Sequence, residues 1–398
     1  MRTALSLAAA ALIATACADA QAGSGWTTIV DTLPSGTIHV VNTPPSNEAP
    51  PWQLHEELRI GSVDEEGPAT FGEIKALVVD STGRIIVLES QAQEVRVFEA
   101  DGQHVATYGG KGGGPGEFAS AFGLMQASNE LLYVPDQRNA RMSVLSADSG
   151  FLRSYPLTLL RWGYVWDGVM RQDDHIIVPS LVFETRRGLV RIYSPDLTQV
   201  DSVLLPEPAV VNQSDPPGAF AWSSADEQVS GYTRVPFFAT GAGFIDKSGM
   251  GWASTPGDPA YRIHRITLSG DTTSLVETRR SPLPVTESER DSAMNAVYEG
   301  LKEYGVTRLD ASKIPAYKPT VLGLFNDDNG DLWVQTSSPD SLRRYDVYSS
   351  LGEYRGSVVS RLNVVTYLQP VVRGDAFYAV ALDELDVPYV VRARITRD

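Results

Sequence analysis

One pattern of short strands recurs along the chain and constrains its fold more than any other feature. Its clearest copy begins with two apolar segments, 74–79 and 85–88, separated by a turn at 80–84. Two further strand-like segments follow at 95–98 and 104–108. A unit of four short strands cannot bury both faces alone, so copies must stack on one another, and copies of this size close into a β-propeller.

The turn between the first and second strand of each copy allows the copies to be counted. These turns are centred on Gly83, Asn129, Asp174, Gly249, Gly330 and Gly374. Successive turns lie 46, 45, 75, 81 and 44 residues apart. Three spacings have the length of one blade, and the other two exceed it by roughly 30 and 36 residues. The sequence therefore predicts an all-β, six-bladed β-propeller with four-stranded blades.

The two long spacings predict insertions at 206–236 and 281–319. The first insertion is rich in Pro, Ser, Asp and Gly and has no strand pattern. The second has apolar residues at helical spacing, namely Met294, Val297, Tyr298 and Leu301.

Signals at both ends of this apolar stripe define a helix. Thr286 and Glu289 have the spacing of a capping box, and Gly305 can end the helix. One helix is therefore expected over 287–304, inside an otherwise all-β chain.

The two ends of the chain are expected to share the last blade. Segment 389–395 supplies only its third strand, and segment 52–60 can supply the missing outer strand. Such sharing closes the ring and leaves no long sheet edge exposed. Segment 27–40 reads as an extra hairpin, and residues 26–398 are expected to form a single propeller domain.

Residues 1–20 read as an export signal, because a short basic start precedes an apolar run too short to span a bilayer. Two cleavage patterns compete. The stretch ending at Cys17 resembles a bacterial lipoprotein box, which would make Cys17 the lipidated first residue; Ala18-Asp19-Ala20 fits release before Gln21. The expected location is the periplasm, or the outer membrane or cell surface as a lipoprotein.

The composition limits the classes of binding partner that are expected. The net charge is −16, which argues against nucleic acid and anionic lipid as partners, because both are negatively charged. Membrane contact is expected only through a lipid anchor, and the protein is expected to be a monomer. Cys17 is the single cysteine, so the mature chain is expected to lack disulfides and thiol chemistry.

The glycine-rich segment at 109–118, which ends Gly-Pro-Gly-Glu-Phe, resembles the link between blades in NHL-repeat proteins. The following segment 136–141 matches the Asp-x-x-Asn-x-Arg pattern of that family. The resemblance is sharp over 61–156 and weaker afterwards. It points to the exported bacterial six-bladed propellers related to NHL proteins, and it implies binding more readily than catalysis.

Propeller geometry places both insertions on one face. Loops from an outer strand to the next blade share a face with the turns between second and third strands, so both insertions should lie beside 109–118, 136–141 and 184–187. A rigid scaffold with long loops on one side is a common binding surface. The alternative is that these loops only cap the mouth of the tunnel.

The candidate binding residues on this face are polar or aromatic: Asp136, Arg138, Asn139, Arg141, Trp166, Asp167, Glu184, Arg186 and Trp222. The aromatic rings suit sugars, peptides or flat apolar ligands. Several of these residues also have a structural interpretation, in which 136–141 ties blades together, Trp166 fills a gap between blades and 184–187 is a solvated turn.

Two functions remain open from the sequence. The first is a non-catalytic binding or scaffolding module of the cell envelope that holds a glycan, peptide or protein partner. The alternative is a metal-assisted hydrolase or lyase with a carboxylate-lined axial site. No catalytic or metal-ligating residue and no cofactor is assigned, and calcium has only weak support. Asp327–Asp331 resembles the start of a calcium loop but is interpreted as a hairpin turn.

Overall fold

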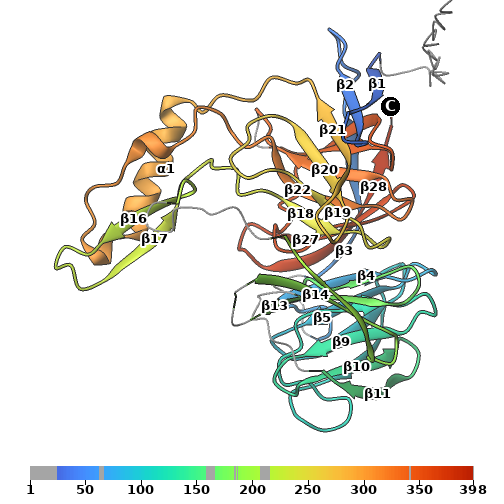
Figure 1. Cartoon of the computed structure of the whole chain (residues 1–398). Coiled ribbons are helices and arrows are strands. Elements are labelled where there is room, and N and C mark those ends of the chain that lie inside the picture. Colours follow the sequence, from blue (N-terminus) through green and yellow to red (C-terminus); the bar gives the residue numbers. More distant parts are fainter. Residues whose placement is uncertain are drawn as a thin grey trace, which may run out of the picture.

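The computed structural model describes residues 25–61, 67–157, 166–182, 185, 187–206, 216–339 and 342–397. Export-signal residues 1–20, with Cys17, lie outside them. Six four-stranded units follow one another along the chain (Figure 1). The six-bladed propeller predicted from the turn spacing is therefore confirmed.

Blades 1 to 3 are separate antiparallel sheets. Blade 1 contains β4 (Ile74–Val79), β5 (Ile85–Glu89), β6 (Glu94–Phe98) and β7 (His104–Gly109). Blade 2 contains β8 (Met125–Gln126), β9 (Leu132–Asp136), β10 (Arg141–Ser146) and β11 (Gly150–Pro156). Blade 3 contains β12 (Val169–Met170), β13 (Ile176–Val182), β14 (Arg187–Tyr193) and β15 (Gln199–Leu204).

Blades 4 to 6 all receive strands or contacts from the N-terminus. Blade 4 contains β18 (Gly243–Ile245), β19 (Gly251–Ala253), β20 (Arg262–Ile266) and β21 (Thr272–Thr278). Blade 5 contains β22 (Val321–Asn326), β23 (Leu332–Thr336), β24 (Arg343–Tyr348) and β25 (Tyr354–Ser360). Blade 6 contains β26 (Val371–Arg373), β27 (Ala376–Leu382), β28 (Pro388–Thr396) and β3 (Trp52–Ile60).

An apolar cluster joins every neighbouring pair of blades. Five of these clusters contain many fully buried side chains, including the one that packs Ile60, Ile74 and Val390 between blades 6 and 1. Between blades 3 and 4 the buried set is smaller: Ile177, Val190 and Ile192, against partly buried Ile245. The hydrophobic effect therefore closes the ring through all six contacts between blades.

The N-terminal arm, residues 25–60, holds blades 4, 5 and 6 together. Strand β2 (Ile38–Thr43) pairs with β1 (Thr27–Thr32) and runs parallel to β21 on the outside of blade 4. Trp26 stacks on Tyr354 of blade 5 at 3.7 Å between ring centroids. Strand β3 then pairs antiparallel with β28 along most of its length. Closure of the ring by 52–60 is confirmed.

The two insertions form one small module beside the ring (Figure 1). It contains β16 (Ala219–Ser223), β17 (Ser230–Arg234), α1 (Glu287–Gly300), η1 (Lys302–Tyr304) and η2 (Ala311–Lys313). The capping box at Thr286 and Glu289 is present, and Gly305 ends η1 at a φ of 64°. The predicted helix is thus confirmed.

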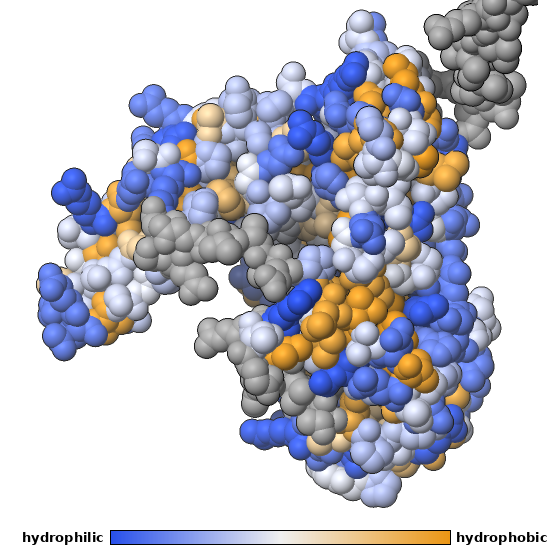
Figure 2. Space-filling model, viewed as in Figure 1, coloured by the Kyte–Doolittle hydropathy of each residue, from blue (hydrophilic) through white to orange (hydrophobic). Residues whose placement is uncertain are grey.

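The prediction that the first insertion has no strands is wrong. Strands β16 and β17 form a hairpin, and Phe220 packs with Val235, Met294 and Ile314 in a core shared with the second insertion. A two-stranded hairpin is only marginally stable alone, so packing on α1 stabilises strands that the local sequence does not indicate. Figure 2 shows the module projecting from one side of the ring.

Because successive strands in each blade are antiparallel, the turns after the second strands and the links between blades emerge on one face of the ring. We call this side the loop face. The module belongs to it, since both insertions lie in links between blades and share one core. In the described residues no helix is long and apolar enough to cross a bilayer.

Candidate functional site

The polar residues predicted in blade 2 bind their own chain. Asp136 is fully buried at the end of β9, and its carboxylate accepts hydrogen bonds from the backbone N–H groups of Ala119 and Ser120 at 3.0 and 2.9 Å. It also accepts one from the Asn139 side chain at 2.6 Å. A buried carboxylate needs such donors, because removing its charge from water is costly.

Asn139 and Arg141 hold the glycine-rich link. Asn139 donates to the carbonyl of Gly112 at 3.0 Å, and Arg141 donates to the carbonyls of Gly114 and Glu117 at 2.7 and 2.6 Å. Arg138 is exposed. The conspicuous motif of blade 2 is thus largely engaged in shaping a turn, and a ligand-binding role for it remains a prediction.

Blade 1 uses an acidic residue in the same way. Glu89 is buried at the end of β5 and accepts hydrogen bonds from the backbone N–H groups of Gly72 and Glu73 at 3.0 and 2.9 Å. Both acidic side chains thus fasten the link that leads into their own blade. This repetition supports a structural reason for an acidic residue at this point of the repeat.

The predicted aromatic residues also make internal contacts. Trp166 donates to the Met125 sulfur at 3.1 Å and meets the Phe122 ring edge-on at 5.7 Å, filling space between blades 2 and 3. Trp222 lies in the module, 4.9 Å from the Tyr304 ring. Asp167 is exposed. Glu184 and Arg186 lie outside the described residues.

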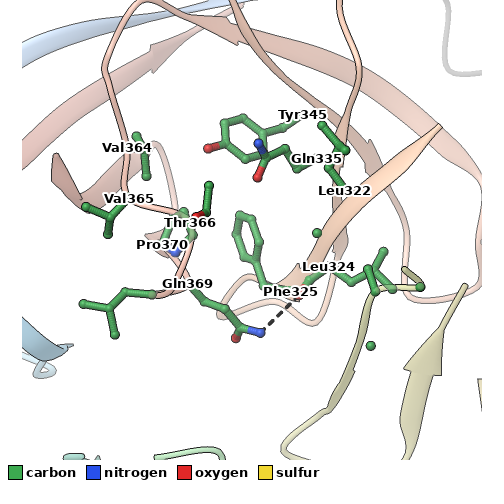
Figure 3. A pocket seen from close by; sticks show the side chains of 15 residues that line it. Leu322, Leu324, Phe325, Gln335, Tyr345, Val364, Val365, Thr366, Gln369 and Pro370 are labelled. Atoms are coloured by element: carbon green, nitrogen blue, oxygen red, sulfur yellow. Dashed lines mark hydrogen bonds between the residues drawn. The ribbon is translucent and has the colours of Figure 1, made fainter. Parts of the chain in front are cut away.

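A cavity of about 280 Å³ opens where blades 4, 5 and 6 meet (Figure 3). Segment 241–243 leads into β18, segment 322–325 belongs to β22, and segment 364–370 leads into β26. Gln335 on β23 and Tyr345 on β24 complete the lining. The segments before β18 and β26 are links between blades, so the cavity lies at the loop face, next to the innermost strands.

Two side-chain hydrogen bonds fix segment 361–370, which supplies one wall of the cavity. Arg343 of β24 donates to the Val364 carbonyl at 2.8 Å, and Gln369 donates to the Leu324 carbonyl at 3.1 Å. The backbone of Val365 also donates to Val380 in β27 at 2.9 Å. This wall is therefore tied to both blades 5 and 6.

Strand β22 is irregular where it lines the cavity. Its register with β23 shifts between Val321 and Gly323, and Leu322 between them is 46% exposed. A bulge bends a strand and redirects a side chain. A Cβ at Gly323 would meet Gln335 Oε1 at 3.4 Å, so the missing side chain leaves space for that amide.

The cavity lining carries no formal charge at neutral pH. Its polar side chains are Gln335, Gln369, Thr366 and Tyr345, and the other lining residues are apolar or glycine. Burial raises the pKa of Tyr345 to about 12, so its hydroxyl stays protonated. Figure 3 shows Gln335 and Tyr345 together on one side, Gln369 on another and Phe325 between them.

A charged cluster supports the far side of β24. The fully buried Asp346 accepts hydrogen bonds from Tyr261 at 3.0 Å, Arg280 at 2.6 Å and Arg344 at 3.2 Å. Glu48 of the N-terminal arm pairs with Arg280 at 2.7 Å. Although burial disfavours its charge, Asp346 and Glu48 raise the pKa of Arg280 above its ordinary value. The cluster balances its charges internally and fixes β24 beside Tyr345.

The sequence predicted a binding surface at the loop face but none of the residues that line the cavity. Gln335 and Gln369 belong to no motif, and they approach the same space only because β23 and the link before β26 come from neighbouring blades. The irregular β22 also gives no clear signal, since one glycine within a strand-like segment has several explanations.

The described residues contain no group of three or more His, Cys, Asp or Glu arranged to hold a metal ion. The Asp327 carboxylate accepts hydrogen bonds from the backbone N–H groups of Asn329 and Asp331 and from the Trp333 side chain. The prediction that Asp327–Asp331 is a turn is confirmed.

A family described as a 6-bladed beta-propeller matches residues 69–159 of the chain. No curated protein matches. This match covers blades 1 and 2 with their links, the part of the chain in which the sequence motifs are sharpest.

Similar solved structures include a DUF4221-family protein from Bacteroides vulgatus, with 10% identity, a TM-score of 0.45, and coverage of 87% of this chain and 99% of that one. A candidate exported protein from Bacteroides fragilis has 12% identity, a TM-score of 0.42, and coverage of 87% and 99%. Virginiamycin B lyase from Staphylococcus aureus has 11% identity, a TM-score of 0.39, and coverage of 93% and 100%.

Proposed function

We propose that the protein is a binding module of the cell envelope that holds a small uncharged ligand, or an uncharged part of a larger partner, at its loop face. The site is the cavity between blades 4, 5 and 6. The observation that carries the proposal is the lining, which places two carboxamides and two hydroxyls among apolar side chains and glycines. Binding cavities commonly combine apolar walls with a few placed polar groups.

The absence of charge in the lining selects for a neutral ligand. A charged group that entered the cavity would lose water without gaining an opposite charge, which costs free energy. The volume of about 280 Å³ lies near the lower end of the range for small-molecule sites, which is about 300–1,000 Å³. The cavity therefore suits a compact ligand or one compact group of a larger partner.

We further propose that the protein is exported, either lipidated at Cys17 or released before Gln21. The leader-like composition of residues 1–20 supports export, and mass spectrometry of the processed N-terminus distinguishes the two forms. In either form residues 25–60, which include the strand β3 that completes blade 6, stay with the mature protein, because both cleavage points precede residue 25.

Filling the cavity tests the binding site directly. The φ of Gly323 lies outside the left-handed region, and the atoms near an added Cβ belong to Gln335, so Gly323→Val should place a side chain in the cavity with little strain. Compounds from a panel of neutral sugars, amides and capped peptides that raise the Tm of the wild-type protein should lose this effect in Gly323→Val.

The matched control is Leu351→Ser, at a turn between the third and fourth strands of blade 5, where the side chain is 70% exposed. This variant should respond to ligands as the wild-type protein does. Equal stabilisation of Gly323→Val and the wild-type protein would show that the ligand binds elsewhere.

A further inference from the structure

The cavity resembles a site for one sugar ring more than a site for a peptide. We propose, on the basis of the binding function above, that its ligand is a neutral monosaccharide unit, free or at the end of a glycan. Gln335, Gln369, Thr366 and Tyr345 each carry groups that both donate and accept hydrogen bonds. Sugar hydroxyls have the same dual capacity.

The positions of these groups suit a compact polyol. They come from β23, β24 and the link before β26, so they surround the cavity from more than one side (Figure 3). Leu322 and Phe325 offer carbon surface between them. A pyranose ring, with hydroxyls around its edge and C–H groups on its faces, can use both kinds of surface.

A peptide would need a different wall. One common way in which an extended peptide binds is by adding to the free edge of a regular strand, where N–H and C=O groups alternate. Here β18 has only three residues, and β22 changes register beside Leu322. Neither strand presents a long regular edge to the cavity, which disfavours a peptide bound by strand addition.

Gln369 gives the site a directional requirement. One of its N–H groups donates to the Leu324 carbonyl at 3.1 Å, which fixes the plane of the amide. Its Oε1 therefore accepts from a fixed position, and a ligand hydroxyl can donate to it. Because Gln369 is exposed, an analogue without that hydroxyl loses this one hydrogen bond, and water can take its place at the amide.

Calorimetric titration and thermal unfolding with neutral sugars test this inference. The probes are glucose, galactose, mannose and N-acetylglucosamine, the disaccharides maltose and chitobiose, glucuronate as a charged comparison, and acetylated dipeptide amides as the peptide comparison. At about 100 times its Kd, a binding sugar should raise Tm by a few degrees. Monosaccharides test the free ligand, and stronger binding of the disaccharides indicates a glycan end.

Variants of the amides should remove this effect. Gln335→Leu and Gln369→Leu should each weaken sugar binding by up to about tenfold, the value of one neutral hydrogen bond. Thr366→Val keeps the shape of an exposed side chain and provides a second test if either leucine variant unfolds. Gln103→Leu, an exposed glutamine in a turn of blade 1, is the matched control and should bind as the wild-type protein does.

The outcomes separate the two proposals. Binding of dipeptide amides alone, lost in Gly323→Val, would overturn the sugar inference and leave the binding site in place. Sugar binding that survives in Gly323→Val and both glutamine variants would overturn both proposals. The absence of any Tm change with every sugar would overturn the sugar inference.

Discussion

Blade 2 and the cavity between blades 4, 5 and 6 both place polar side chains at the loop face, but they use them differently. In blade 2, Asp136 and Arg141 bind backbone groups of the same chain. At the cavity, Gln335 and Gln369 line an open space, and Gln369 uses one N–H to hold its own wall. A conspicuous polar motif therefore identifies a tightly built link, whereas the groups accessible to a ligand carry no motif.

The largest expected effect is a loss of stability on removing the N-terminal arm. This arm contacts blades 4, 5 and 6, which form the cavity. Deleting residues 25–60 removes β3 and exposes the edge of β28. It also removes Glu48 and Trp26 from the supports of blade 5. We expect aggregation or loss of cooperative unfolding, because an apolar sheet edge is left unpaired.

Size-exclusion chromatography with thermal unfolding measures this effect. The control is a chain that starts at residue 25, which keeps the arm and should remain monomeric and cooperative. A protein without residues 25–60 that is still monomeric and unfolds cooperatively would contradict the assigned closure of the ring.

The second largest effect is expected in blade 2. Asp136→Ala removes the acceptor for the N–H groups of Ala119 and Ser120 and for the Asn139 side chain. The unpaired donors should lower the free energy of unfolding by about 3 kcal/mol. Denaturant unfolding measures the loss, and Asp136→Asn, which keeps one carbonyl acceptor, should lose less.

Ligand binding by the Asp136 variants distinguishes a structural role of Asp136 from a role in binding. If Asp136 only shapes the link, folded Asp136→Asn should keep the affinity of the wild-type protein for any ligand of the cavity. A folded variant with lost affinity would instead assign Asp136 to the binding surface, as the sequence motif suggested.

A smaller change in stability is expected at the cavity. Gln369→Leu removes the hydrogen bond to the Leu324 carbonyl, and because Gln369 is exposed the loss should be no more than about 1 kcal/mol. Denaturant unfolding tests this value. A loss as large as that of Asp136→Ala would mean that Gln369 is mainly a structural residue, and the contrast between the two regions would disappear.

The smallest expected effect is a pH-dependent change in the stability of the module. Hydrogen bonds from Lys318 and from the backbone and side chain of Thr286 lower the pKa of Glu289 from 4.5 to about 2. A lowered folded-state pKa means that its contribution to stability is complete above pH 4.5 and is lost as the pH falls towards 2. The N-terminal turn of α1 should therefore loosen in this range.

Hydrogen exchange of the α1 peptides between pH 5 and pH 2, corrected for the intrinsic rate, measures this change. Glu289→Gln keeps a capping residue but loses the charge, so its α1 should show a weaker dependence on pH. An unchanged pH response in Glu289→Gln would assign the effect to another group.

The sequence predicted the parts of the fold that repeat. Gly83 and Gly330 mark equivalent turns, and the composition of 52–60 indicated the strand that closes blade 6. The helix was predictable because Thr286, Met294 and Gly305 report local geometry. These signals depend on neighbouring residues in the chain.

The features that were missed depend on contacts between distant segments. Strands β16 and β17 are stabilised by packing on α1, some 60 residues away along the chain. The cavity requires β18, β22 and the link before β26 to meet, which no local pattern encodes. The contrast between blade 2 and the cavity arises for the same reason: whether a polar side chain is already engaged depends on the tertiary structure.

Hydrogen exchange with and without the sugar that stabilises the protein most tests the central claim most directly. The account predicts slower exchange in 321–326 and 361–370 on binding, with no change in 109–121. Slower exchange confined to 109–121 and 136–141, with no change in the cavity walls, would contradict this account and would place the binding site at blade 2.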